Sequence, residues 1–169
     1  MRYAKFLETL LIRGHSLKSV RAFTLVEIIL TIAILGTLSA IAVPIYNGYI
    51  DKARNSTAVA DIGGIEGDIV KFQAERGRPP NTLAEAGIPT KLDPWGHPYE
   101  YLRLQFAGVD PKTIPGHRKD KHLNPLNSDF DLYSKGKDGN SASPLTAPAS
   151  YDDIVRANNG VFVGLGSDY

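Results

Sequence analysis

The feature that most constrains this chain is a run of apolar residues from Phe23 to Val43. The run contains one charged residue, Glu27, and a helix of about 20 residues is long enough to cross the roughly 30 Å hydrocarbon core of a membrane. We therefore predict a transmembrane helix over residues 23–46. Residues 1–22 contain five basic residues and one acidic residue, so we expect this end to stay in the cytoplasm. The chain beyond the helix then lies outside, in the periplasm of a cell with two membranes.

Glu27 needs a partner within this apolar run. A lone carboxylate deep in a membrane costs about 2.5–3.5 kcal/mol on insertion scales, and no basic residue lies between Phe23 and Val43. Cleavage after Ala22 would create a new α-amino group on Phe23, and that amine would neutralise Glu27 of an adjacent copy. The nearest cation in the sequence is Arg21, just before the run, so Arg21 and the new amine stay open as partners of Glu27.

Pro44 lies at the far end of the apolar run. Proline removes a hydrogen bond from a helix, so we expect the helix to bend or to melt locally at this position. Two interpretations stay open for Pro44: a contribution to packing between assembled copies, and a kink that is merely tolerated.

The start of the chain combines a short basic leader, a small residue at Ala22, and the sequence Phe-Thr-Leu-Val-Glu from Phe23 to Glu27. Together with Pro44, this resembles the prepilin signal of type IV pilins and type II secretion pseudopilins. The resemblance implies that a prepilin peptidase cleaves between Ala22 and Phe23, that the new amine is methylated, and that Glu27 guides assembly. The family usually has Gly before the cut, and because Ala is the next smallest side chain we expect slower processing at worst. The alternative is a cytoplasmic tail that is never removed from a simple membrane anchor.

Three segments are predicted: a prepilin leader over residues 1–22, a transmembrane and assembly helix over residues 23–46, and a periplasmic globular domain over residues 47–169. With 169 residues, the chain has room for one modest domain beyond the membrane helix. Removal of the leader leaves 14 basic and 17 acidic residues, a net charge of about −3, so we expect no nucleic-acid partner. The chain contains no Cys, so disulfides cannot hold an exported domain together, and in this it resembles the major pseudopilins.

Beyond Tyr46 the pattern becomes amphipathic, and it predicts a helix that continues to about Glu75. Two later segments combine alternating strand residues with turn residues: 93–102, with the core D-P-W-G-x-P-Y, and 130–140, with D-x-Y-S-x-G-x-D-G. Both segments are similar to parts of the major pseudopilins. We therefore predict an α+β fold of the type IV pilin kind, in which a long N-terminal helix packs on a small antiparallel β-sheet.

Residues 106–129 form a polar segment that is longer than the corresponding connection of the major pseudopilins. The segment contains a basic cluster at residues 117–122, His-Arg-Lys-Asp-Lys-His. We interpret this cluster as solvated surface. Contact with anionic lipid, with nucleic acid or with an acidic face of a secreted protein stays open as an alternative.

Acidic residues bracket a C-terminal loop rich in Gly, Ser and Asn, a composition that lets carboxylate and carbonyl oxygens surround Ca²⁺. The major pseudopilins that the chain resembles hold one structural calcium in this loop. The resemblance implies that Asp138 and either Asp152 or Asp153 bind calcium, with the Lys135 carbonyl as a backbone ligand. The alternative is a turn aspartate and an acidic pair on the surface.

The resemblance implies a structural subunit of a type II secretion pseudopilus rather than an enzyme. It also implies the partners: further copies in a helical filament, minor pseudopilins, the prepilin peptidase and an inner-membrane assembly platform. One alternative is a subunit of a type IV pilus or a competence pilus. A membrane-anchored periplasmic enzyme is a second alternative, but the chain contains no nucleophile-elbow, phosphate-loop or zinc-helix motif.

Overall fold

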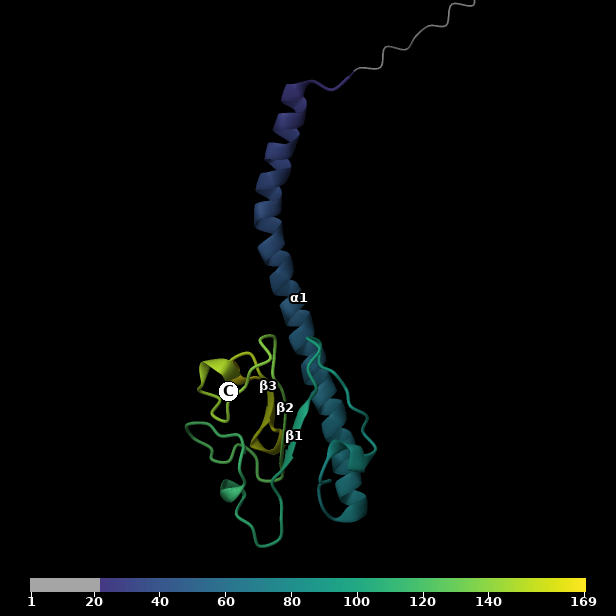
Figure 1. Ribbon diagram of the computed structural model, residues 1–169, viewed down its shortest axis with the longest axis vertical. Helices are drawn as coiled ribbons and strands as arrows, with labels where there is room; N and C mark the ends of the chain where they lie inside the picture. The colour runs from purple at the N-terminus through teal and green to yellow at the C-terminus, as the bar shows by residue number, and fades with distance from the viewer. Residues whose placement is uncertain (1–21) are drawn as a thin grey trace, which may run out of the picture. The chain divides into compact units, whose positions relative to one another are not determined.

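The computed structural model describes residues 22–169, and the predictions that concern residues 1–21 lie outside this part (Figure 1). The described part divides into a first unit that ends at Pro44 and a second unit, Ile45–Tyr169. Its main elements are one α-helix and four β-strands: α1 (Leu25–Arg76), β1 (Glu100–Arg103), β2 (Phe130–Ser134), β3 (Ile154–Ala157) and β4 (Phe162–Leu165).

The first unit contains the N-terminal part of α1, and its large apolar side chains are exposed. This part is long and apolar enough to cross a membrane. Exposed apolar surface on this scale requires lipid or neighbouring protein to cover it. The backbone stays helical on both sides of Pro44, so the structure contains no local melting there, and the expected bend stays a prediction.

The C-terminal part of α1 belongs to the second unit and ends at Arg76, which confirms the predicted helix end near Glu75. Gly77 has a φ of 71°, a left-handed conformation that glycine adopts without strain and that commonly ends helices. A short 3-10 helix at Leu83–Ala86 follows, between its N-cap residue Thr82 and the left-handed Gly87.

The four strands form one antiparallel sheet in the order β1-β2-β3-β4, and its strands lie beside the C-terminal part of α1 (Figure 1). One face of the sheet packs on the helix, because the buried apolar stripe of α1 meets alternate residues of the strands. This core is formed mainly by Ile62, Ile65 and Ile69 of α1 with Tyr99, Phe130, Leu132 and Ile154. The predicted α+β fold of the type IV pilin kind is confirmed.

The opposite face of the sheet has a second, smaller core. Val155 and Ala157 alternate with Ile154 along β3 and therefore face away from α1. They pack with Leu126 and Leu145, which come from the long segments before β2 and before β3. The polar segment 106–129 therefore covers part of the sheet, which its composition did not predict.

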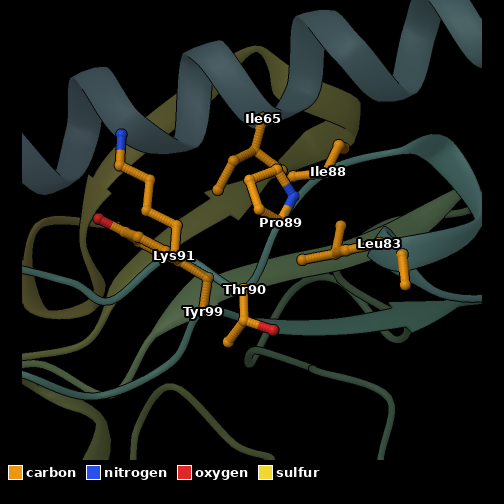
Figure 2. Close-up of a pocket in the computed structure, with 8 residues that line it drawn as sticks. Ile65, Leu83, Ile88, Pro89, Thr90, Lys91 and Tyr99 are labelled. Carbon is orange, nitrogen blue, oxygen red and sulfur yellow. The ribbon is translucent and has the colours of Figure 1, made fainter.

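A cavity of about 350 Å³ lies between α1 and the segment after the first 3-10 helix (Figure 2). Its lining is mostly apolar: Ile65, Leu83, Ala84, Ile88, Pro89, Thr90, Lys91 and Tyr99. The polar groups at its edge bind one another, since the Tyr99 hydroxyl donates to Asp61 Oδ2 at 2.9 Å and Lys91 Nζ donates to Asp61 Oδ1 at 2.6 Å. These contacts fasten the segment to α1.

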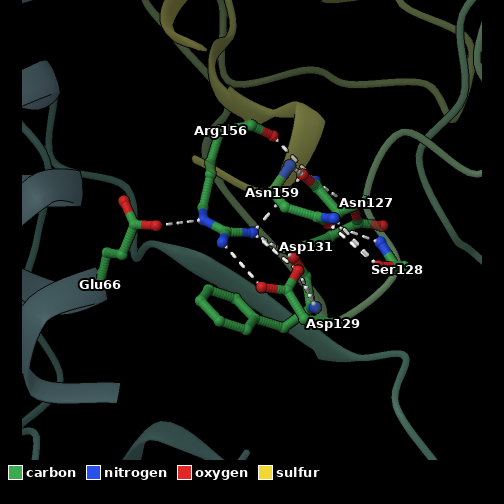
Figure 3. Close-up of polar contacts among 8 residues, drawn as sticks. Glu66, Asn127, Ser128, Asp129, Asp131, Arg156 and Asn159 are labelled. Carbon is green, nitrogen blue, oxygen red and sulfur yellow. Dashed lines mark hydrogen bonds and ion pairs between the residues drawn. The ribbon is translucent and has the colours of Figure 1, made fainter. Parts of the chain in front are cut away.

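Arg156 joins α1 to the sheet from a buried position (Figure 3). Its Nε donates to Glu66 Oε1 of α1 at 2.7 Å, and its Nη1 and Nη2 donate to the two carboxylate oxygens of Asp129 at 2.8 and 2.7 Å. The guanidinium also lies 4.0 Å from the centre of the Phe130 ring. One side chain thus connects the helix, the start of β2 and β3.

Candidate functional site

The C-terminal loop begins with a tight turn after β2 that lies directly against Asp152. Gly136 has a φ of 64°, and a Cβ added there would lie 2.2 Å from the Asp152 carbonyl oxygen and 2.8 Å from its Oδ2. The Asp138 N–H donates to Asp152 Oδ2 at 2.9 Å, and Asp138 Oδ1 accepts the Asn140 N–H at 2.7 Å. The structure therefore brings Asp138 and Asp152 together, 14 residues apart in the sequence.

Asp153 lies in a different environment from its neighbour Asp152. It is fully buried, and its Oδ2 accepts hydrogen bonds from Arg118 Nη2 and from the Ser141 hydroxyl, each at 2.6 Å. Burial raises the pKa of the Asp153 carboxyl, and the hydrogen bond from Ser141 and the positive charge of Arg118 oppose that rise. The two acidic residues that the sequence left as alternatives are thus distinct in the fold.

Asp138 and Asp152 place carboxylate oxygens at this turn, and oxygen is the ligand type that Ca²⁺ takes in proteins. Asp138 and Asp152 are adjacent, and the absence of a side chain at Gly136 lets the Asp152 carbonyl approach the turn. Lys135 Nζ forms an ion pair with Glu100 Oε1 at 2.5 Å, so the Lys135 side chain lies with β1. Within residues 22–169, no three His, Asp or Glu side chains converge on one point, so a larger carboxylate cage is not present there.

The same turn is fastened to α1 and to the D-P-W-G segment. Lys137 Nζ forms an ion pair with Asp51 of α1 at 2.7 Å. The Nδ1 of His97 lies 3.2 Å from the Gly136 carbonyl oxygen, at hydrogen-bond distance. Asp93 is buried and accepts hydrogen bonds from the His97 N–H at 2.8 Å and from the Ser134 hydroxyl at 2.5 Å. Asp93 and His97 thus connect the D-P-W-G segment to β2 and to the turn that follows it.

At the other end of the described chain, Ala22 and Phe23 are exposed and precede α1. Glu27 lies in the first turn, where its Oε2 accepts hydrogen bonds from the Thr24 N–H and the Thr24 hydroxyl, each at 2.9 Å. The Glu27 N–H donates back to the Thr24 hydroxyl at 3.2 Å. This reciprocal arrangement is a capping box, and the T-x-x-E spacing could have predicted it.

The basic cluster at residues 117–122 requires a correction. Arg118 is buried, so the interpretation of the whole cluster as solvated surface was wrong for this residue, whereas Lys121 and His122 are exposed. Arg118 is buried because it forms an ion pair with the buried Asp153, and the sequence did not indicate that Asp153 is buried. No signal local to residues 117–122 distinguishes Arg118 from its neighbours.

Comparisons with known proteins identify relatives along most of the chain, although no protein-family model matches and no solved structure matches with significance. Type II secretion system core protein G of Klebsiella pneumoniae is 32% identical over 139 residues, which are 79% of this chain and 91% of the relative. The protein of the same name from Dickeya chrysanthemi is 30% identical over 146 residues, 83% of this chain and 88% of the relative. A fimbrial protein of Neisseria meningitidis serogroup B is 33% identical over 148 residues, 81% of this chain and 83% of the relative.

These relatives agree with the structure. A long N-terminal helix on a small antiparallel sheet is the fold expected for pilin-like proteins. The D-P-W-G segment forms the turn before β1, and the D-x-Y-S-x-G-x-D-G segment covers most of β2 and the turn after it. The chain therefore belongs to the family of type II secretion system core protein G, within the type IV pilin-like proteins.

Proposed function

We propose that this protein is a structural subunit of a type II secretion pseudopilus. Copies cleaved before Phe23 leave the membrane side by side and build a helical filament that drives protein export across the outer membrane. The observation that carries this proposal is the exposed apolar part of α1, with Glu27 in its first turn, which continues as one helix into a pilin-like domain. A helical filament needs head-to-tail contacts that do not close into a ring, and a long helix on every copy supplies a surface for them.

The proposal includes a location and a set of partners. Residues 23–46 anchor the subunit in the inner membrane, and residues 47–169 lie in the periplasm until assembly. A prepilin peptidase removes residues 1–22 and the new amine of Phe23 is methylated. The filament then grows at an inner-membrane assembly platform with minor pseudopilins. The similarity to type II secretion core proteins supports this set of components.

A structural calcium ion is proposed at the C-terminal turn, held by Asp138, Asp152 and backbone oxygens that include the Lys135 carbonyl. When bound, the ion would supply the positive charge that lets two neighbouring carboxylates hold the ends of the loop together. The ion pair between Asp153 and Arg118 is the reason to prefer Asp152 as the ligand.

The test of the filament proposal removes the charge of Glu27 and keeps its cap. In Glu27→Gln the amide oxygen can still accept the Thr24 N–H, so insertion and folding should persist. Filament formation should fall strongly, because the proposed contact with the amine of a neighbour's Phe23 loses its counter-charge. Cysteine crosslinking between copies in cells that assemble filaments measures this, with the chain's lack of native Cys giving a clean background.

The matched control is Glu75→Gln, which makes the same chemical change on an exposed carboxylate near the far end of α1. Its crosslinks should equal those of the unmodified protein. Normal filaments in Glu27→Gln would contradict the proposed pairing.

Mass spectrometry of the N-terminus should show a chain that begins with methylated Phe23, and a chain that stays full length in cells with active peptidase would contradict the processing step.

A type IV pilus subunit is the second candidate, and the similarity to a fimbrial protein across most of the chain favours it. Deletion of the gene separates the two functions. Secreted proteins should accumulate in the periplasm if the protein serves secretion, whereas loss of surface fibres with normal secretion would support the pilus.

A further inference from the structure

Asp153 is a buried acid that requires a positive partner. Its side chain has no exposed surface, and its other carboxylate oxygen, Oδ1, has no hydrogen-bond partner. Removing a carboxylate from water is unfavourable unless a cation and hydrogen bonds replace the lost hydration. In a calcium-binding loop the metal would be the obvious cation. Here the group in contact is the guanidinium of Arg118, 35 residues earlier in the chain.

The fold holds Arg118 in place at its backbone as well as its side chain. The Arg118 N–H donates to Asp131 Oδ2 at 2.7 Å, and its carbonyl oxygen accepts the Leu126 N–H at 2.7 Å. The guanidinium lies 4.2 Å from the centre of the Tyr133 ring and donates a second hydrogen bond to the Ser141 hydroxyl. Ser141 in turn donates to Asp153, so the three side chains form a closed triangle of contacts.

The segment that carries Arg118 is thereby attached to the outer face of the sheet. Lys119 pairs with the strand-like residues beside Pro144, since its N–H donates to the Ser143 carbonyl at 3.1 Å and its carbonyl accepts the Leu145 N–H at 2.9 Å. Leu126 and Leu145 then complete the second core. Arg118 lies at the centre of this cover, between the segment, β2 and the start of β3.

We propose that the guanidinium of Arg118 neutralises the buried Asp153 in place of a metal ion. This ion pair holds residues 106–129 against the sheet without any metal. This inference goes beyond the proposed filament function and does not depend on it. The proposal also gives the two acidic neighbours different roles: Asp152 accepts a hydrogen bond at the turn of Asp138, whereas Asp153 forms the ion pair with Arg118. A guanidinium keeps its charge throughout the pH range of proteins and no chelator removes it, so this contact does not depend on the supply of a metal ion.

The experiment uses the full chain purified in detergent and compares hydrogen exchange and melting with and without a calcium chelator. Peptides that cover residues 106–129 should keep the same protection in both conditions. Arg118→Gln leaves Asp153 buried without its cation, so exchange of these peptides should rise at least tenfold and the melting temperature should fall by roughly 10 °C. The double variant Arg118→Gln with Asp153→Asn should recover at least half of that loss, because it removes both charges.

The matched control is Lys121→Gln, which removes an exposed cation three residues further along the same segment and should change neither readout. The proposal is overturned if the chelator alone releases residues 106–129 in the unmodified chain. It is overturned equally if Arg118→Gln melts and exchanges like Lys121→Gln. If the double variant melts and exchanges like Arg118→Gln alone, Arg118 does not stabilise the fold through its charge.

Discussion

Two buried arginines join segments of the second unit that lie far apart in the sequence. Arg156 contacts Glu66, 90 residues earlier, and Arg118 contacts Asp153, 35 residues later. Each guanidinium also lies over an aromatic ring of β2. A planar fork with five N–H donors can bind several acceptors and stack on a ring at the same time, which an ammonium group cannot do. In a chain without Cys, these side chains perform part of the fastening that disulfides perform in other exported domains.

One exposed ion pair gives a prediction about acid stability. Hydrogen bonds from Arg78 and from the Asn81 N–H lower the pKa of Glu85 from its ordinary value of 4.5 to about 2. A carboxyl with a lowered pKa in the fold contributes stability above its unfolded pKa and loses it as the pH falls through the folded value. Glu85→Gln should therefore melt lower than the unmodified protein at pH 6, and the difference should disappear between about pH 4.5 and pH 2. Melting curves across this range measure it.

The partner supplies the control for this prediction. In an Arg78→Gln background, Glu85→Gln should have a much smaller effect on the melting temperature at pH 6, because the first cause of the lowered pKa is absent. If the melting temperatures of Glu85→Gln and the unmodified protein differ by the same amount at pH 6 and at pH 2, the charge of Glu85 makes no contribution to folding.

At the scale of the elements, α1 contains glycines that its own subunit does not explain. Gly63, Gly64 and Gly67 lie on the exposed face of the helix, and a Cβ added to any of them would meet no atom within 4 Å. Glycine inside a helix is less favourable than alanine by about 0.8–1 kcal/mol. Because no atom of the subunit packs closely on these positions, no contact within the subunit compensates for that cost. The helix is thus less stable in the isolated chain than its length permits.

Gly64→Ala should therefore raise the free energy of unfolding of the isolated subunit by about 0.8–1 kcal/mol, since the new methyl group meets no other atom and favours the helix. Denaturant unfolding of the detergent-purified chain measures this gain. Gly136→Ala is the contrasting variant, and it should be destabilising because its Cβ would lie 2.2 Å from the Asp152 carbonyl oxygen at a φ of 64°. A loss of stability in Gly64→Ala would contradict the open environment of that position.

At the scale of the whole molecule, the second unit is closed by contacts on both faces of its sheet. α1 covers one face, and residues 106–129 with the loop before β3 cover the other. The turn at Asp138 lies at the edge of this arrangement, where Lys137 reaches α1 and Asp152 leads into β3. An ion at that turn would add a connection between the two strands that border the C-terminal loop.

Calcium should raise the melting temperature of the full chain in detergent, and a chelator should lower it again. An ion that binds only the folded state stabilises it by about 2.7 kcal/mol at a hundredfold excess over its Kd. Asp138→Ala and Asp152→Ala should each abolish the shift. Asp153→Asn should lower the melting temperature with and without calcium but keep the shift, because its partner is Arg118.

Magnesium is the control ion, and it should substitute poorly because it demands octahedral geometry and gives up its water reluctantly. A melting temperature that ignores both calcium and chelator would rule out the ion. A shift that disappears in Asp153→Asn but persists in Asp152→Ala would reverse the assignment of the two aspartates.

The sequence by itself determined the features that depend on local chemistry. The apolar run opened by Phe23, the end of α1 before Gly77, the strand at Phe130–Ser134 and the turn after it follow from periodicity, charge and glycine placement, which act over a few residues. The capping box at Thr24 and Glu27 has an equally local signal in the T-x-x-E spacing.

Only the tertiary structure decided which charged side chains are buried and which residues adjacent in sequence lie in different environments. Asp152 and Asp153 are adjacent in sequence, yet consecutive residues that lead into a strand point to different sides, one toward the turn at Asp138 and the other toward Arg118. The burial of Arg118 depends on Asp153, 35 residues further along the chain, and no residue near Arg118 in the sequence carries that information.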